Sequence, residues 1–375
     1  MTGVSYAAKH RCERHLHHLE QANPHLRRIN WFSAPVCDAP LDRLCGVIDS
    51  AWKRAYGNRV RVAYSPALLR LACAGHPEEH GIISWAEEDG APCGVIVGLP
   101  LQFETEGSEE KVPATLTTGL SCSAEWEGRG MVEMLMARHA VTLMERGHSF
   151  SIHWRATDAQ SVSGTARLSR ARITRLLGRA IWPSVAARRA GSGFWAKLGI
   201  ELHSAWYPSG KPLPPSWSME INTTRAAFHT AQLVRTCFIR QTPRRHYPAG
   251  YFQTLSRFNA EGIQGVVAVF REGVEPAGVI WGCINPTAGD AFFLLDGMVF
   301  HPEAPAHWRW RALSFLEGYL KENNVFATLA PESAFYPDVP PGWLCLKRYA
   351  VGSIPFEPVS WLTPGWLSGI PLELR

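Results

Sequence analysis

Long apolar runs are absent from the sequence, since no stretch approaches the roughly 20 residues that a transmembrane helix needs. The first ten residues also lack the apolar core of a secretion signal. None of the nine cysteines lies in a Cys-x-x-Cys pair, and an odd number scattered along the chain does not suit a disulfide framework. These absences predict a cytoplasmic protein without stable membrane insertion, whose thiols are free.

Charge is also scarce. Acidic and basic side chains make up 19% of the 375 residues, and the net charge is only +5. The chain as a whole is therefore not predicted to bind nucleic acid or a membrane surface. Hydrophobic residues make up 46%, which is enough to fill the cores of two ordinary domains.

Metal-ligand clusters are not evident either. The first thirty residues are rich in His and Arg, but no second cluster with metal-ligand spacing follows them. We therefore expect an N-terminal extension over residues 1–40 that begins with an exposed helix, and no metal site.

What the sequence does contain is a regular succession of strands and helices. Apolar residues at helical spacing predict helices over 41–56 and 131–146, and Ser65-Pro66 predicts the capped start of a short helix. Strands are predicted over 81–87, 93–103, 114–122 and 150–154, the first two joined by a tight turn.

The second half repeats this plan. Strands are predicted over 265–271, 278–284, 291–300 and 325–329, with a helix over about 308–320 before the last of them. Pro92-Cys-Gly-Val-Ile-Val-Gly98 recurs as Pro276-Ala-Gly-Val-Ile-Trp-Gly282, at an offset of 184 residues. A domain-sized period of this kind predicts two tandem domains. Residues 212–218, rich in proline and serine, are predicted to link them.

A later landmark suggests that the two copies differ in length. Lys197-Leu-Gly-Ile200 matches Lys347-Arg-Tyr-Ala350 at an offset of only about 150, so we expect an insertion in the first copy over 160–190. Residues 161–190 hold seven arginines and no acid, and their apolar residues fall close to helical spacing. A basic amphipathic helix can contact an acidic carrier protein, a tRNA or an anionic membrane, or it can lie solvated as a cover over the acceptor cleft.

The segment from Leu120 to Val132 ends a strand and begins a helix. It contains Gly128-Arg129-Gly130. Glycines at such a junction let backbone N–H groups approach a ligand, and the helix N-terminus adds partial positive charge. The combination suits a diphosphate, although a plain tight turn explains a lone Gly-x-Gly equally well.

This segment resembles the acyl-CoA loop of the GNAT acyltransferases, in which the fourth strand is followed by a Gln/Arg-x-x-Gly-x-Gly/Ala loop and a long helix. Downstream, Gly193-Phe-Trp-Ala-Lys-Leu-Gly-Ile-Glu201 resembles the Phe-Tyr-x-x-Leu-Gly-Phe signature on the last helix of that family. The two motifs stand in the order of the family and follow a two-strand hairpin. The resemblance spans about residues 40–210, and the repeat extends a weaker version over about 220–362.

The resemblance implies an α+β (mixed α/β) fold of two tandem GNAT-like domains, 41–211 and 219–375, each a twisted, mostly antiparallel sheet flanked by helices. It implies that acetyl-CoA or another acyl-CoA is the donor substrate, and that the backbone of Leu120, Ser121 and Cys122 pairs with its pantetheine arm. Trp195 would flank the thiol. The residues implied at the diphosphate are Glu127, Gly128, Arg129, Gly130, Met131 and Val132.

Three residues depart from the family pattern. Glu127 stands where the family has Gln or Arg, Val132 stands where it has Gly or Ala, and Trp195 replaces a Tyr that often protonates the leaving thiolate. An acidic side chain repels a diphosphate unless it points away. Tryptophan cannot act as an acid at neutral pH.

The catalytic candidates are few. Tyr207 could replace the missing acid, and Glu125 and His153 could deprotonate an acceptor amine. For each of them, an ordinary exposed or hydrogen-bonded side chain is the alternative interpretation.

The second copy has a degenerate loop. Residues 300–308 contain no glycine and two prolines, which remove N–H donors. We therefore expect the second domain to bind no CoA, but to pack against the first and shape the acceptor cleft. Similar pseudo-dimeric arrangements occur in mycothiol synthase-like enzymes, in N-myristoyltransferases and in the tRNA-dependent peptidoglycan-bridge transferases.

The predicted function is acyl transfer from acyl-CoA, or another phosphopantetheine thioester, to an amine of a small molecule. Two alternatives stay open. In one, the donor is an acyl carrier protein or an aminoacyl-tRNA. In the other, the chain is a binding protein that has kept the fold without catalysis.

Overall fold

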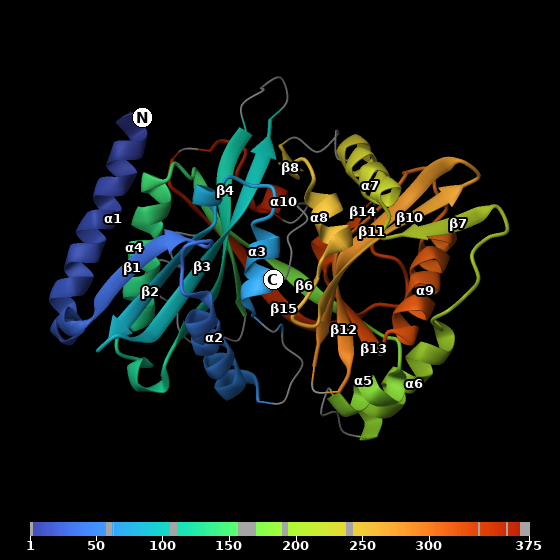
Figure 1. Cartoon of the computed structure of the whole chain (residues 1–375), viewed down its shortest axis with the longest axis horizontal. Coiled ribbons are helices and arrows are strands. Elements are labelled where there is room, and N and C mark those ends of the chain that lie inside the picture. Colours follow the sequence, from blue (N-terminus) through green and yellow to red (C-terminus); the bar gives the residue numbers. More distant parts are fainter. Residues whose placement is uncertain are drawn as a thin grey trace.

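The computed structural model describes residues 3–57, 62, 64–105, 111–156, 170–189, 194–237, 243–287, 289–336, 338–357 and 359–367. Its strands form a single mixed, mostly antiparallel sheet with helices on both faces (Figure 1). The fold is therefore mixed α/β, as the sequence predicts.

The first half contains β1 (Asn30–Pro35), β2 (Ile82–Glu88), β3 (Ala91–Glu104), β4 (Lys111–Cys122), β5 (Phe150–Ala156) and β6 (Arg170–Ala180). Its helices are α1 (Gly3–Ala22), α2 (Leu41–Tyr56), α3 (Pro66–Ala72), α4 (Met131–Glu145), α5 (Pro183–Arg189) and α6 (Phe194–Trp206), and short 3-10 turns lie at η1 (Pro24–Arg28), η2 (Glu78–His80) and η3 (Ala124–Trp126).

The second half contains β7 (Trp217–Ile221), β8 (Arg244–His246), β9 (Asn259–Ala260), β10 (Ile263–Glu272), β11 (Glu275–Pro286), β12 (Ala291–Phe300), β13 (Val325–Pro331), β14 (Phe335–Tyr336) and β15 (Leu344–Pro355). Its helices are α7 (Thr224–Cys237), α8 (Tyr251–Arg257), α9 (Ala306–Glu322) and α10 (Pro364–Leu367), with a 3-10 turn at η6 (Glu332–Ala334).

Local signals placed these elements well. The hydroxyl of Ser65 accepts a hydrogen bond from the backbone N–H of Leu68 at 3.2 Å, and Pro66 opens α3. Asp89 and Gly90 both have positive φ, at 50° and 79°, as a tight two-residue hairpin turn requires. The predicted capped helix and the predicted hairpin are therefore confirmed.

The strand order shows an exchange between the two halves. From one edge the order is β1-β2-β3-β4-β5, from the other it is β7-β10-β11-β12-β13, and β15 and β6 lie side by side in the middle. β15 pairs with β5, and β6 pairs with β13. Each half thus donates its last strand to the other half, and the two strands lie side by side at the centre of Figure 1. The duplicated segments Pro92–Gly98 and Pro276–Gly282 occupy matching places in β3 and β11.

Two expectations for the arginine-rich stretch are wrong. Residues 170–180 form a strand and not a helix, because their backbone groups pair with β15 and β13 on either side. Lys347–Ala350 lies in β15 whereas Lys197–Ile200 lies in α6, so those two landmarks do not correspond. The true counterpart of β15 is β6, and the offset that suggested an insertion disappears with the false match.

Helices cover both faces of the first half. Leu44 and Ile48 of α2 pack on one face against a core that includes Leu116 and Ile152. Met131 and Leu135 of α4 pack on the other face. α1 lies along the outer side of α4, where Glu20 accepts from Arg138 at 2.6 Å and Glu145 pairs with Lys9 at 2.9 Å. The N-terminal helix is therefore a layer of the fold.

Candidate functional site

Strands β4 and β5 separate partway along their length. They pair in parallel from Ala114 with Phe150 to Thr117 with His153. Beyond that point β4 continues beside β3, whereas β5 follows β15. Among the described residues no strand pairs with β4 on its β5 side over 118–122. The backbone there forms an open edge inside the sheet.

A β-bulge lies at the start of this open edge. Val95 pairs with Ser121 and Val97 with Thr118, so Gly119 and Leu120 together face the single residue Ile96. Gly119 has a φ of +62°, a conformation that favours glycine. The bulge turns the backbone at the point where the two strands part.

Several buried polar atoms along the diverging segments lack partners. The hydroxyl oxygens of Ser121 and Ser123 and the indole nitrogen of Trp154 are buried and have no hydrogen-bond partner among the described residues. Buried polar groups in native proteins are nearly always paired. A ligand or an ordered water could complete the hydrogen bonding of these atoms.

The matching edge in the second half is closed. Gly94 pairs with Cys122, and its repeat partner Gly278 pairs with Phe300, so Leu120 and Ser121 correspond to Met298 and Val299. β14 pairs in parallel with those two residues. A short extended segment of the chain therefore fills, in the second half, the position that is open in the first.

The open edge leads into the glycine loop. Gly128 and Gly130 have φ values of +71° and +78°, and Gly130 is the N-cap of α4 without any side-chain cap. The first amide groups of α4 have no carbonyl of a preceding turn to bond. A Cβ on Gly128 would meet nothing within 4 Å, whereas one on Gly130 would meet the side chain of Asn23 at 2.6 Å. The loop is thus open at Gly128 and packed at Gly130.

Arg54 of α2 ties the end of β4 to this loop. Its guanidinium donates to Glu127 Oε1 at 2.9 Å and to the carbonyl oxygen of Cys122 at 2.8 Å. The carboxylate of Glu127, which would repel a diphosphate on its own, is therefore paired with a cation. The sequence gives no signal for this contact, because the two residues lie 73 positions apart.

The N-terminal segment adds basic side chains beside the loop. His25 Nε2 hydrogen-bonds the carbonyl oxygen of Arg129 at 2.9 Å, and its ring stacks on Trp126. The guanidinium of Arg28 lies 5.1 Å from the centre of the Trp126 ring and pairs with Glu88 at 2.8 Å. The His- and Arg-rich extension therefore reaches the predicted diphosphate site, which the sequence did not indicate.

A tyrosine from the link between α2 and α3 lies at the bulge. The hydroxyl of Tyr64 hydrogen-bonds Thr118 Oγ1, and its ring meets Trp52 edge-on at 5.1 Å between centroids. Tyr64 is only 6% exposed, and this burial raises the pKa of its phenol above the ordinary value. It was not among the candidates from sequence, because no motif surrounds it.

The structure gathers some of the predicted residues and separates others. Glu125 is exposed on η3 next to the glycine loop, and His153 lies on β5 at its last pair with β4. Trp195 belongs to α6, which lies beside α5 on the side of the second half, away from the loop (Figure 1). Tyr207 follows α6, and its carbonyl oxygen accepts from Arg179 at 2.9 Å.

Two arginines of the exchanged strand β6 and one of α5 are paired within the chain. Arg179 donates to Glu317 at 2.7 and 2.8 Å, and both side chains are almost fully buried. Arg175 pairs with Glu332 at 2.5 Å, and Arg189 with Asp290 at 2.6 Å. All three carboxylates come from the second half. These three arginines therefore join the two halves.

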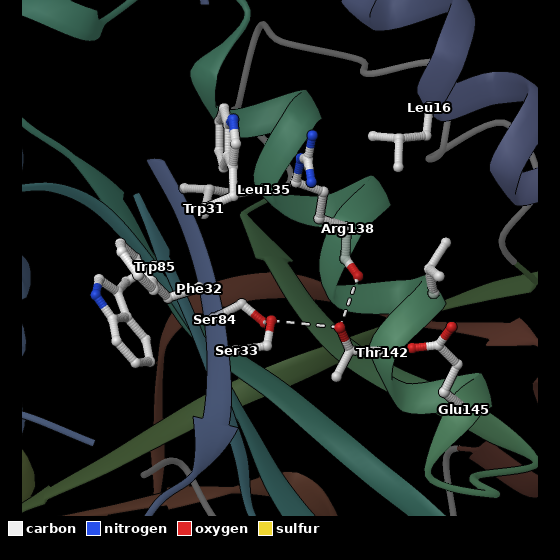
Figure 2. A pocket seen from close by; sticks show the side chains of 11 residues that line it. Leu16, Trp31, Phe32, Ser33, Ser84, Trp85, Leu135, Arg138, Thr142 and Glu145 are labelled. Carbon is white, nitrogen blue, oxygen red and sulfur yellow. Dashed lines mark hydrogen bonds between the residues drawn. The ribbon is translucent and has the colours of Figure 1, made fainter. Parts of the chain in front are cut away.

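A separate cavity of about 290 Å³ lies between α1, β1 and α4 (Figure 2). Its walls are mixed, with apolar side chains such as Leu16 and Leu135 and polar ones such as Arg138. Its hydroxyl groups bond to one another, since Ser33 Oγ is 2.8 Å from Ser84 Oγ and 3.3 Å from Thr142 Oγ1. No residue of the open β4 edge lines this cavity.

Comparisons with known proteins bear on the fold. The sequence matches no protein-family model and no curated protein. Among solved structures, N-myristoyltransferase from Saccharomyces cerevisiae with bound myristoyl-CoA and inhibitors matches with a TM-score of 0.64 at 10% identity, over 91% of this chain and 83% of that chain. A tandem GNAT protein from the clavulanic acid biosynthesis pathway matches with a TM-score of 0.55 at 14% identity, over 88% of this chain and 100% of that chain.

A GCN5-related N-acetyltransferase from Anabaena variabilis matches with a TM-score of 0.50 at 10% identity, over 86% of this chain and 72% of that chain. Together these likenesses show that the chain has the tandem GNAT fold, as the sequence resemblance implied. In the part of the chain that the structure describes, no helix is long and apolar enough to cross a membrane.

Proposed function

We propose that this protein transfers an acyl group from acyl-CoA to a primary amine of a small molecule, with the donor held in the first half. The observation that carries the proposal is the open β4 edge over 118–122, which runs directly into the glycine loop and the uncapped N-terminus of α4. An extended pantetheine arm can add to such an edge as a strand does. The diphosphate would then lie at the amide groups of the helix terminus.

The second half supports this assignment by contrast. Its matching edge is occupied by β14, and its loop carries Pro302 and Pro305, with Pro305 as the N-cap of α9. The pairing of β14 with β12 supports the proposal that an extended ligand can add to the corresponding open edge of β4. We therefore propose one donor site per chain, with the second half shaping the acceptor side.

Acyl-CoA is favoured over a macromolecular donor. The carrier-protein and tRNA alternatives depended on free arginines in 161–190, but Arg175, Arg179 and Arg189 are paired within the chain. Arg28 and Arg54 are also paired, with Glu88 and Glu127, but unlike those arginines they lie beside the glycine loop, where a cofactor phosphate is proposed.

The division into units and the location remain proposals as well. We propose that residues 41–211 and 219–375 arose as two copies, since β2, β3, β4 and β5 stand in the same order in the sheet as β10, β11, β12 and β13. We also propose the cytoplasm as the location, because all nine cysteines are free thiols and a reducing compartment preserves them.

Thermal unfolding with and without acyl-CoA tests the proposal. A ligand that binds only the folded chain stabilises it by about 2.7 kcal/mol at a concentration 100 times its Kd, so millimolar acetyl-CoA or a longer acyl-CoA should raise Tm by several degrees. ATP at the same concentration controls for unspecific phosphate binding. If no acyl-CoA raises Tm more than ATP does, the donor assignment is wrong.

A further inference from the structure

The length of the donor places its thioester at the β-bulge. The pantetheine arm has about as many chain atoms as four residues of an extended strand, which span roughly 13 Å. An arm that starts at the glycine loop and follows β4 backward from Cys122 therefore reaches Thr118 with its sulfur. Thr118 is the first residue beyond the last pair with β5, so the reacting group lies where the strands part.

The side chain that reaches this point is Tyr64. Its hydroxyl hydrogen-bonds Thr118 Oγ1, and a Cβ on Gly119 would lie 3.4 Å from its ring. The fully buried Ile48 of α2 lies 3.2 Å from the same Cβ position. The phenol is thus held between α2 and the bulge, with its hydroxyl at the Thr118 side chain, on the strand that the thioester would follow.

The position of Tyr64 matters because the last helix of the motif has no tyrosine to act as an acid. Trp195 stands where GNAT acyltransferases often have a tyrosine, and α6 lies away from the glycine loop. A thiolate expelled near Thr118 still needs a proton. A phenol is protonated at neutral pH, and Tyr64 is the phenol that lies at this point of β4.

We propose that Tyr64 is the general acid that protonates the departing thiolate, an inference that rests on the proposed function. The acceptor nitrogen attacks the thioester carbonyl carbon, and a C–N bond forms. The C–S bond then breaks, and the sulfur takes the proton of the Tyr64 hydroxyl. The acceptor nitrogen releases one proton to water, and the tyrosinate regains one from water, so the net products are an amide and a free thiol.

Changing the leaving group separates an acid from a structural tyrosine. The donors are acetyl-CoA and its selenoester analogue, whose selenol is a much stronger acid and leaves without a proton, and hydroxylamine serves as the amine. Tyr64→Phe should lower kcat with acetyl-CoA at least about tenfold, with KM within about twofold, and should lower kcat with the selenoester less than about twofold. Tyr319→Phe, a partly buried tyrosine of α9, is the matched control.

A second variant guards against misfolding. Tyr64→Phe leaves the Thr118 hydroxyl without its partner, so the double variant Tyr64→Phe with Thr118→Val removes both polar groups and should show the same dependence on the leaving group. Equal losses with both donors, or no loss with acetyl-CoA, would overturn the role of Tyr64. Wild-type protein that processes neither donor would instead refute the proposed function, and this role with it.

Discussion

The guanidinium of Arg54 donates to Glu127 Oε1 at 2.9 Å and so neutralises the one acid that departs unfavourably from the GNAT loop pattern. Both side chains are partly exposed, at 37% and 59%, so the pair itself adds little stability. The pair matters electrostatically, because a Glu127 carboxylate that is paired with Arg54 would repel a diphosphate at the proposed site less than a free carboxylate.

Replacing Glu127 should therefore strengthen donor binding. Glu127→Gln frees Arg54 while keeping the shape of the side chain, and we expect the Kd of acetyl-CoA to fall about threefold at low salt. Arg54→Gln should raise it. Calorimetry at low and at high salt checks both variants. An unchanged Kd for Glu127→Gln at low salt would mean that the diphosphate does not lie near this pair.

A charge at Gly128 should do the opposite. Gly128 has a positive φ and open space where a Cβ would stand, and Asp and Asn both tolerate that conformation. Gly128→Asp should weaken acetyl-CoA binding about tenfold or more through repulsion of the diphosphate, while the uncharged Gly128→Asn should change Kd less than about threefold. Equal effects of the two variants would indicate a structural disturbance and count against the diphosphate site.

The stability of the molecule should depend on the exchanged strand. Glu317→Ala leaves the buried Arg179 without its partner, so the free energy of unfolding should fall by roughly 3–5 kcal/mol. Arg175→Gln removes a pair that is 49% exposed on the arginine side and should cost less than about 1 kcal/mol. Urea unfolding of both variants measures the difference. Similar losses would show that the Arg179–Glu317 pair does not anchor β6 to α9.

Acid should destabilise the first half through buried histidines. Burial lowers the pKa of His139 to about 3 and that of His148 to about 4, from an ordinary value of 6.5. The unfolded chain therefore takes up these protons at a higher pH than the folded chain, so their stabilising contribution is complete above about pH 6.5 and is lost as the pH falls toward 3.

Titration of stability checks this prediction. The free energy of unfolding, measured between pH 4 and 7, should decrease as the pH is lowered. His139→Gln should reduce the slope of that free energy against pH by the equivalent of about one proton. A variant with the same slope as the wild type would show that His139 is not the group that titrates.

Features that depend on neighbouring residues could be predicted from the sequence, whereas features that depend on residues far apart in the chain could not. The cap at Ser65, the turn at Asp89-Gly90 and the repeated Pro92–Gly98 segment are set by neighbouring residues and were placed correctly. The strand over 170–180 was predicted as a helix, because its apolar residues also fit a helical period. Only its pairing with β13 and β15, each more than 140 residues away, fixes it as a strand.

The residues of the candidate site also fall into those that lie close together in the sequence and those that reach the site from elsewhere. The open edge at Leu120–Cys122 and the loop at Gly128–Gly130 lie within one continuous segment, and that segment carried the resemblance. Arg54 and Tyr64 reach it from α2 and the link after it. Their positions depend on how α2 packs on the sheet. The periodicity of the sequence predicts that α2 has a buried face, but not which residues it brings to the site.

The number of donors bound per chain tests the central claim most directly. The account places one acyl-CoA on the open edge of β4 and none on the edge of β12 that β14 occupies. Isothermal titration of the purified protein with acetyl-CoA should therefore give a stoichiometry of about one per chain, and Gly128→Asp should weaken that single site. A stoichiometry near two, or a titration without heat at any acyl-CoA concentration together with no bound CoA in native mass spectra, would contradict it.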